Sequence, residues 1–340
     1  MGYWWLSLKR PIGKRQATAC ILTYFRAFMA LFLFYDGAWL PEGQPLVSAQ
    51  SRGFRYGDGL FETLYVRDGA IRLARYHFER LLEGMRLLEL RLPENYDAAW
   101  LADRVAALCK KNGHSPARVR LTVFRGEGAL FDGPGAPAHY LIESQPLTVA
   151  PLVPNQGGAG STPDSRLPTP DSELPTPDSG LPTPDPGLLT GIFPHARKAA
   201  DAYSHCKTNN YLPSVLAALH ARRQGWNDAV LLNAAGRVCE SAIANLFIVS
   251  DGRVYTPPLS EGCVAGVMRR FLLEQLGAAG YAVEEKPVSV EALYAADEVF
   301  LTNALHPLRP VLRCDHVRYD TRLGMEIAQA IQKMDVDMWK

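Results

Sequence analysis

In the first half of the chain, hydrophobic residues follow two different periods. Short runs rich in β-branched and aromatic residues at 61–66 and 119–124 predict strands, and residues 31–36 predict an earlier strand that runs into a turn. Residues 80–90 place apolar side chains three and four positions apart, which predicts an amphipathic helix. Residues 98–110 repeat that pattern and stop before an Asn-Gly pair. This half is therefore predicted to be mixed α/β.

The second half alternates helices and strands in the same way. Helices are predicted at 211–223 and 264–276, and strands at 229–233, 245–250, 253–256 and 298–302. The Asp251-Gly252 pair between two of these strands is a strong hairpin signal. Neither G-x-G-x-x-G nor G-x-x-x-x-G-K-[ST] occurs, so a nucleotide-binding fold lacks its usual motif.

A seven-residue repeat separates the two halves. STPDSR, LPTPDSE, LPTPDSG and LPTPDPG follow one another over residues 161–187. Frequent proline removes amide donors and disfavours helix, and little apolar surface is available to bury. We therefore predict an extended, disordered linker at 151–190, between a smaller α/β domain at 29–150 and a larger domain at 191–340.

The N-terminal segment resembles a targeting signal only in part. Basic residues precede an apolar stretch at 18–34, but Arg26 interrupts it and no small-residue cleavage site follows. The uninterrupted length is also below the roughly 20 residues that a membrane-spanning helix needs. We expect residues 1–28 to be a disordered extension of a cytoplasmic protein without a membrane anchor.

Charge and cysteine content exclude several classes of protein. The chain has 36 Lys+Arg and 35 Asp+Glu residues, and this balance argues against a dedicated partner of nucleic acid or acidic membranes. Six cysteines occur without a C-x-x-C pair or a tight Cys/His cluster. We therefore expect neither a metal site nor a disulfide framework, and predict buried, reduced thiols.

The residues most indicative of chemistry lie at 240–269. Glu240 is the first residue of E-S-A-I-A-N-L-F and comes just before a predicted strand. About 25 residues later, V-A-G-V-M-R places a glycine where a helix begins. The start of such a helix offers free N–H groups and a partial positive charge, which suit a phosphate. A carboxylate with a phosphate site is what a pyridoxal 5'-phosphate (PLP) pocket requires, and Lys207 in H-C-K-T-N-N-Y-L is the candidate for its Schiff base.

Four blocks in the same order identify a family resemblance. Besides 240–269 and K-T-N-N-Y-L, these are S-R-G-F-R-Y-G-D-G-L-F-E-T and H-F-E-R-L. Over about residues 31–315 the chain resembles the class-IV aminotransferases, the fold-type IV PLP enzymes. The resemblance implies a two-domain α/β (α+β) fold, with a smaller N-terminal and a larger C-terminal domain. It also implies a homodimer, because pockets in this family lie near a subunit interface.

The resemblance assigns roles to individual residues. Lys207 would bond covalently to PLP and then move the proton, and Glu240 would face the pyridine nitrogen and strengthen the cofactor as an electron sink. Arg80 would bind the phosphate. Without the family blocks, Lys207 would be read as a solvated surface charge, Glu240 as a capping carboxylate, and Arg80 as a helix residue paired with Glu79 or Glu83.

Three further positions complete the expected cofactor site. Val267 and Met268 would offer backbone N–H groups to the phosphate. Tyr211 would contact the phenolic oxygen of PLP, with core packing as the alternative. His77 precedes Arg80 by one helical turn, and we interpret it as a structural histidine.

The family contains branched-chain aminotransferases, D-amino-acid transaminases and 4-amino-4-deoxychorismate lyases, and departures from their patterns bear on the activity. D-amino-acid transaminases have an Arg and a His where this chain has Leu130 and Asp132, and a tyrosine where it has Phe61. The E-G-x-G-E-N and G-T-A segments of branched-chain enzymes are replaced by E-S-A-I-A-N and T-N-A-L. The Asn303 turn resembles that of the lyases, whereas Tyr211 stands where a familiar lyase has an arginine.

We therefore expect a lyase that forms 4-aminobenzoate and pyruvate in folate synthesis. Asn303 would contact the carboxylate or the ring of the substrate, or would only cap the preceding strand. The alternative is an amino-acid transaminase of the branched-chain or D-amino-acid type on the same scaffold. A third hypothesis is a binding protein that kept the fold without its activity, against which Lys207, Glu240 and Arg80 argue.

Overall fold

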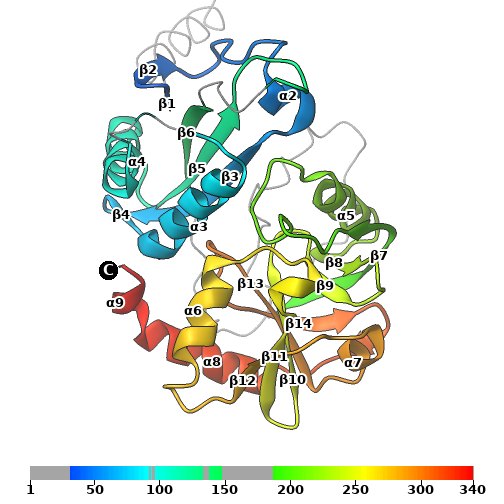
Figure 1. Ribbon diagram of the computed structural model, residues 1–340. Helices are drawn as coiled ribbons and strands as arrows, with labels where there is room; N and C mark the ends of the chain where they lie inside the picture. The colour runs from blue at the N-terminus through cyan, green and yellow to red at the C-terminus, as the bar shows by residue number, and fades with distance from the viewer. Residues whose placement is uncertain (1–30, 92, 94–95, 133–137, 148–186, 340) are drawn as a thin grey trace, which may run out of the picture.

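A computed structural model describes most of the chain in two layered parts (Figure 1). The described residues are 31–339, without 92, 94–95, 133–137 and 148–186. The expectations for residues 1–28 and for the proline-rich repeat up to residue 186 lie outside the described residues. Within the described ranges, no helix is both long enough and apolar enough to span a bilayer.

The first part is built on an antiparallel sheet. In spatial order its described strands are β2 (Ala38–Pro41), β1 (Phe32–Tyr35), β6 (Ala138–Pro146), β5 (Ala117–Arg125), β3 (Gly59–Arg67) and β4 (Ala70–Ile71). Helix α3 (Ala74–Leu87) packs against β3, and α4 (Ala98–Asn112) packs against β1 and β6. A short helix, α2 (Arg52–Tyr56), precedes β3. Because side chains alternate along a strand, one face of the sheet carries an apolar core that the two long helices close.

The second part is a mixed sheet. Its described strands run in the order β12 (Val283–Glu285), β11 (Arg253–Thr256), β10 (Asn245–Ser250), β13 (Glu298–Thr302), β14 (Arg309–Cys314), β7 (Leu188–Lys198), β8 (Asp228–Asn233) and β9 (Val238–Ser241), with β15 (Val317–Arg318) paired to β14. Around it lie α5 (Leu212–Arg223), η1 (Leu259–Glu261), α6 (Val267–Gln275), α7 (Val290–Tyr294), α8 (Arg322–Lys333) and α9 (Asp335–Met338). The predicted α/β class is confirmed.

Most of the predicted elements are present, and two helices begin elsewhere. The predicted helix at 80–90 begins six residues earlier, at Ala74, and ends at Leu87. The helix predicted at 264–276 begins only at Val267. The amide of Val264 donates instead to the Glu240 carboxylate, at 2.9 Å, so the residues before Gly266 are held by the neighbouring strand rather than by a helical turn.

A short segment that contains the candidate Lys207 joins the two parts. Residues 206–209, after β7, return to the first sheet: the Phe61 amide donates to the Lys207 carbonyl at 2.9 Å, and the Asn209 amide donates to the Gly59 carbonyl at 2.9 Å. The Cys206 side chain packs in the core of the first part. In Figure 1 helices α3 and α6 lie side by side at the same junction. The candidate lysine is therefore held between two sheets.

The cysteines agree with the expectation of reduced thiols. Five of the six lie in the described part of the chain, and all five are free and buried: Cys109, Cys206, Cys239, Cys263 and Cys314. No group of three or more potential metal ligands is found among the described residues.

Candidate active site

The predicted site residues converge on one cavity of about 370 Å³ between the two sheets. Six of the seven line it: Arg80, Lys207, Tyr211, Glu240, Val267 and Asn303. The seventh, Met268, is buried next to Val267 in the first turn of α6. Residues from α3, β9 and α6, and from the segments before α5 and after β13, thus meet in space although they are far apart in sequence.

Lys207 presents an amine in a desolvated position. Its Nζ lies 4.4 Å from the centre of the Phe61 ring and 5.3 Å from that of Tyr211. Burial, assisted by the positive charge of Arg80, lowers the pKa of Lys207 from 10.5 to about 8. About a tenth of the amine is therefore neutral at pH 7, and the neutral form is the one that attacks an aldehyde.

Glu240 is a buried carboxylate on β9, and both of its oxygens are engaged. Oε2 accepts the Val264 N–H at 2.9 Å, and Oε1 forms an ion pair with Lys198, at the end of β7. Only 4% of Glu240 is exposed, so the two contacts fix its orientation toward the cavity that it lines. Sequence reasoning did not identify Lys198, which lies outside the matched blocks.

Arg80 has a partner that was not expected. Its Nε and Nη2 donate to the two Glu62 oxygens at 2.8 and 2.5 Å, and its Nη1 donates to the Ala265 carbonyl at 2.8 Å. The alternative interpretation of Arg80, as a helix residue, paired it with Glu79 or Glu83 on the same helix, whereas Glu62 comes from β3. The guanidinium is thereby anchored next to the start of α6.

Glu62 is the buried centre of this small network. Its Oε2 also lies 2.7 Å from His77 Nδ1. Burial works against ionisation, but Arg80 and then His77 outweigh it and lower the pKa of Glu62 to about 2. Burial lowers the pKa of His77, so the imidazole is neutral and donates to Glu62. Glu62 lies within the matched L-F-E-T block, yet only the fold reveals what it holds.

The start of α6 suits an anion. Gly266 caps the helix without a side-chain hydrogen bond, and the first-turn N–H groups of Val267 and Met268 have no acceptor within the helix. A Cβ on Gly266 would lie 1.8 Å from Asn245 Oδ1, so only glycine permits this close approach. With Arg80 beside Ala265, these amides and one guanidinium fit the phosphate of PLP.

The two remaining candidates are partly engaged elsewhere. The Tyr211 hydroxyl donates to the Ala242 carbonyl at 3.0 Å, and its ring packs edge-on against Phe61. Asn303 Oδ1 accepts the amides of Leu305 and His306 at 3.0 and 2.8 Å. The oxygen of Asn303 therefore holds its own turn, while the residue still lines the cavity.

Two arginines that sequence reasoning missed also line the cavity. Arg120 extends from β5, with its guanidinium carbon 3.9 Å from the centre of the Phe61 ring, and Arg309 extends from the start of β14. His306 lies nearby. Burial, and then Arg309 and Arg72, lower its pKa to about 4, so it is neutral. Arg118, Arg120 and Thr122 occupy alternate positions along β5, which indicates that they share one face of the strand. This pattern does not show which face meets the cavity.

Residues 59–314 match the family described as Amino-transferase class IV. The chain belongs to this family. Its members depend on PLP, and the residues above offer an amine, a carboxylate and a helix start that could hold this cofactor. The protein is thus a fold-type IV enzyme.

Individual relatives carry two different activities. The aminodeoxychorismate lyase of Vibrio harveyi is 28% identical over 79% of this chain and 87% of its own. The branched-chain-amino-acid aminotransferase of Escherichia coli strain K12 is 25% identical over 84% and 86%. The crystal structure of the 4-amino-4-deoxychorismate lyase from Pseudomonas aeruginosa is 29% identical, with a TM-score of 0.68 and coverage of 88% and 98%.

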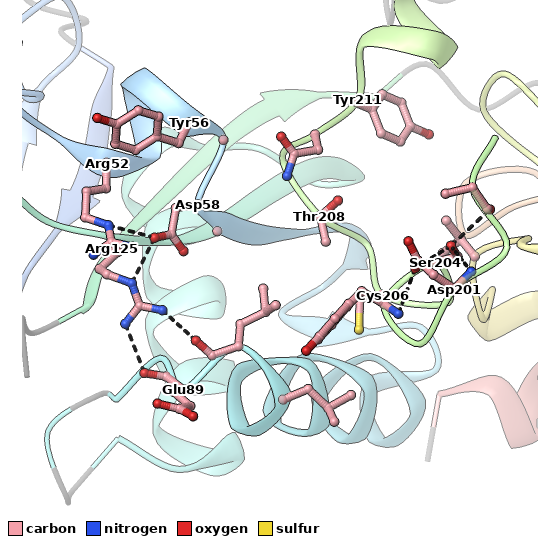
Figure 2. Close-up of a pocket in the computed structure, with 18 of the residues that line it drawn as sticks. Arg52, Tyr56, Asp58, Glu89, Arg125, Asp201, Ser204, Cys206, Thr208 and Tyr211 are labelled. Carbon is pink, nitrogen blue, oxygen red and sulfur yellow. Dashed lines mark hydrogen bonds and ion pairs between the residues drawn. The ribbon is translucent and has the colours of Figure 1, made fainter. Parts of the chain in front are cut away.

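A larger cavity of about 770 Å³ adjoins the first (Figure 2). Asp58 lies between Arg52 and Arg125, with Oδ2 at 3.0 and 2.9 Å from their Nε atoms. Arg125 also donates to the carbonyls of Leu88 and Glu89, so this wall is cross-linked. Tyr211, Ser214 and Val264 line both cavities, whereas Lys207 lines only the smaller one.

Proposed function

We propose that the protein is an aminodeoxychorismate lyase, which converts 4-amino-4-deoxychorismate into 4-aminobenzoate and pyruvate. The observation that carries the proposal is the pair of guanidinium groups, Arg120 and Arg309, in the cavity of Lys207. This substrate has two carboxylates, one on the ring and one on the enolpyruvyl group. Arginine binds carboxylates through two parallel hydrogen bonds, so two arginines match two carboxylates.

An apolar substrate fits this cavity less well. A branched-chain amino acid would place an apolar side chain beside two guanidinium groups, whose N–H donors favour carboxylate oxygens. The cavity also has apolar lining residues, among them Val215, Ala218 and Ile243. A flat six-membered ring could pack against such residues while its carboxylates bind the arginines.

The cofactor-binding roles are part of the proposal. Arg80 and the amides of Val267 and Met268 would hold the phosphate, Glu240 would face the ring nitrogen, and Tyr211 would border the phenolic oxygen. When bound, PLP supplies an electron sink for the electrons left by proton removal. The Phe61 and Tyr211 rings would flank the reacting amine of Lys207.

Lys207 would act as the base. The free Lys207 amine would remove the proton from the substrate ring carbon that bears the nitrogen, while bound PLP would supply the sink for the electrons left behind. The C–O bond to the enolpyruvyl group then breaks, and its electron pair leaves with that oxygen. The ring becomes aromatic, and the expelled enolpyruvate takes up a proton to give pyruvate. No keto acid is consumed.

Transamination is the second candidate, because specific observations favour it. The family includes the E. coli aminotransferase at similar identity, and N-Y-L at Tyr211 also occurs in branched-chain enzymes. The two arginines would equally bind the two carboxylates of glutamate. In that case Lys207 would move the proton from the amino acid to the cofactor.

A product assay decides between the two activities. Purified holoenzyme given 4-amino-4-deoxychorismate should form 4-aminobenzoate and pyruvate in equal amounts. An amino acid given alone should change the cofactor absorbance slowly or not at all. Inactivity with the first substrate, together with rapid conversion by glutamate, would reject the lyase and establish the transaminase.

Arg309→Met tests the observation on which the lyase proposal rests. Each charge-assisted contact contributes about 1.5–3 kcal/mol, so we expect KM for the dicarboxylate to rise roughly 10- to 100-fold. Arg313→Met, on the same strand but outside the cavity, is the matched control and should leave KM unchanged. An unaltered KM in Arg309→Met would remove the argument for a dicarboxylate substrate.

The homodimer also belongs to the proposal. Exposed apolar side chains lie along α5, beside the cavity-lining Val215: Leu212, Leu216 and Leu219. Contiguous apolar surface of this kind is typical of a subunit interface. Light scattering of the purified protein should give twice the 37.5 kDa of one chain.

A further inference from the structure

Lys198 is a buried cation that none of the proposed catalytic steps uses. It lies at the end of β7, its side chain is 15% exposed, and it forms an ion pair with Glu240 Oε1. The other Glu240 oxygen is held by the Val264 amide at 2.9 Å. Lys198 lines the larger cavity and is absent from the lining of the smaller one, which Glu240 lines. The acid that is to face the ring nitrogen therefore already has one cationic partner.

The charges around Glu240 determine what this partner does. The described titratable groups that face it are Lys198, Lys207, Cys239 and Cys263. Burial raises the pKa of both thiols, so they are neutral. Burial disfavours the Lys198 ammonium, but Glu240 outweighs this effect and raises its pKa. Once the Lys207 amine is bonded to the cofactor, Lys198 is the cation in direct contact with the carboxylate.

We propose that Lys198 tunes Glu240. Its positive charge offsets part of the negative charge of the carboxylate, so Glu240 stabilises a protonated ring nitrogen of the bound cofactor less than it would alone. A like charge nearby disfavours a protonated base, and an opposite charge favours it. Lys198 and Glu240 therefore act on the ring nitrogen with opposite sign. The inference rests on the role proposed for Glu240, but it holds for a lyase and a transaminase alike.

The proposal predicts opposite effects for two substitutions. Glu240→Gln removes the negative charge and should lower the protonation constant of the ring nitrogen at least roughly tenfold. Lys198→Met removes the positive charge and should raise the same constant roughly tenfold. If Lys198 only held Glu240 in place, its loss would misplace the carboxylate and move the constant in the same direction as Glu240→Gln.

The measurement is a pH titration of the ring nitrogen itself. Holoenzymes are prepared with ¹⁵N-labelled PLP, and the ¹⁵N chemical shift is followed by NMR. Lys198→Arg keeps the charge and should titrate within about twofold of the unmodified enzyme. Arg237→Met is the matched control, because it removes the cation paired with another buried carboxylate, Glu261, at 2.7 Å, and neither residue lines the cofactor cavity.

Each outcome is decisive. A protonation constant that is lower in Lys198→Met, or equal to that of the unmodified enzyme, overturns the tuning role. If Lys198→Met does not fold, Lys198→Gln removes the same charge and must raise the constant. If Glu240→Gln leaves the constant unchanged, Glu240 is not the partner of the ring nitrogen. The proposed assignment of the site then fails, and the Lys198 inference with it, which differs from a failure of Lys198 alone.

Discussion

The two ends of the active-site cavity are built differently. At the cofactor end, buried ion pairs connect separate elements: Arg80 of α3 binds Glu62 of β3, and Lys198 of β7 binds Glu240 of β9. Each cation is tied to one carboxylate, and each carboxylate is held by a further contact. Under the proposed assignment, these contacts would hold the cofactor-binding groups in fixed positions.

The proposed substrate end is assembled from residues of both sheets. Arg120 comes from the first sheet and Arg309 from the second, so their separation depends on how the two parts pack. Asn303 sits in a turn that its own side chain stabilises. The difference teaches that the family can keep one cofactor site and change its reaction through loops and strand ends at the other end.

The largest expected effect is at the cofactor end. Lys207→Ala removes both the covalent anchor and the base, so we expect kcat to fall by roughly four orders of magnitude. The visible absorbance of the bound cofactor should disappear as well. Lys286→Ala, an exposed lysine outside the cavity, should retain both properties. Retained activity in Lys207→Ala would contradict the assignment of the whole site.

Glu62→Gln tests whether the cofactor end depends on buried charge. It leaves Arg80 without its anion, and breaking a buried ion pair typically costs about 3–5 kcal/mol in unfolding free energy. Glu79→Gln, at an exposed pair with Arg270, should cost at most about 1 kcal/mol. Chemical denaturation measures the unfolding free energy of both variants. Equally small losses would show that the buried Glu62 pair stabilises the fold no more than the exposed Glu79 pair.

The same pair predicts a pH dependence. The pKa of Glu62 is about 2 in the folded chain and 4.5 without its surroundings. Its carboxylate therefore stabilises the fold fully above about pH 4.5, and this contribution is lost as pH falls toward 2. The stability difference between the unmodified enzyme and Glu62→Gln should shrink over this interval. A difference that stays constant would contradict the low pKa.

The pH dependence of PLP uptake by the apoenzyme tests the lowered pKa of Lys207. With a pKa of about 8, the neutral fraction of the amine rises about tenfold per pH unit below 8 and levels off above it. The rate at which apoenzyme takes up PLP should follow this curve in stopped-flow absorbance. A rate that continues to climb tenfold per unit to pH 10 would indicate an ordinary, solvated lysine.

The smallest effect is expected at the substrate end. Asn303→Ala removes two hydrogen bonds to the turn amides, and the unfolding free energy should fall by about 1–2 kcal/mol. Asn303→Asp keeps an acceptor at the same place and should recover most of this loss. Thermal unfolding measures both, and a failure of Asp to recover stability would contradict the turn role.

Local sequence determined much of the cofactor end. Glu240 and the glycine before Val267 lie on one strand–hairpin–helix unit, whose elements the residue pattern already predicted. The hairpin at Asp251-Gly252 and the strand before it follow from turn chemistry and side-chain alternation, which are local properties. The class of fold and the cofactor could therefore be predicted without coordinates.

Only the tertiary structure decided which charges meet. Glu62 and Arg80, like Lys198 and Glu240, belong to different elements, and no periodicity along the chain brings one to the other. Arg120 and Arg309 face one cavity because two sheets pack there, with the Lys207 segment between them. Pairings of this kind depend on sheet order and packing, and these arise from the whole chain rather than from any local run of residues.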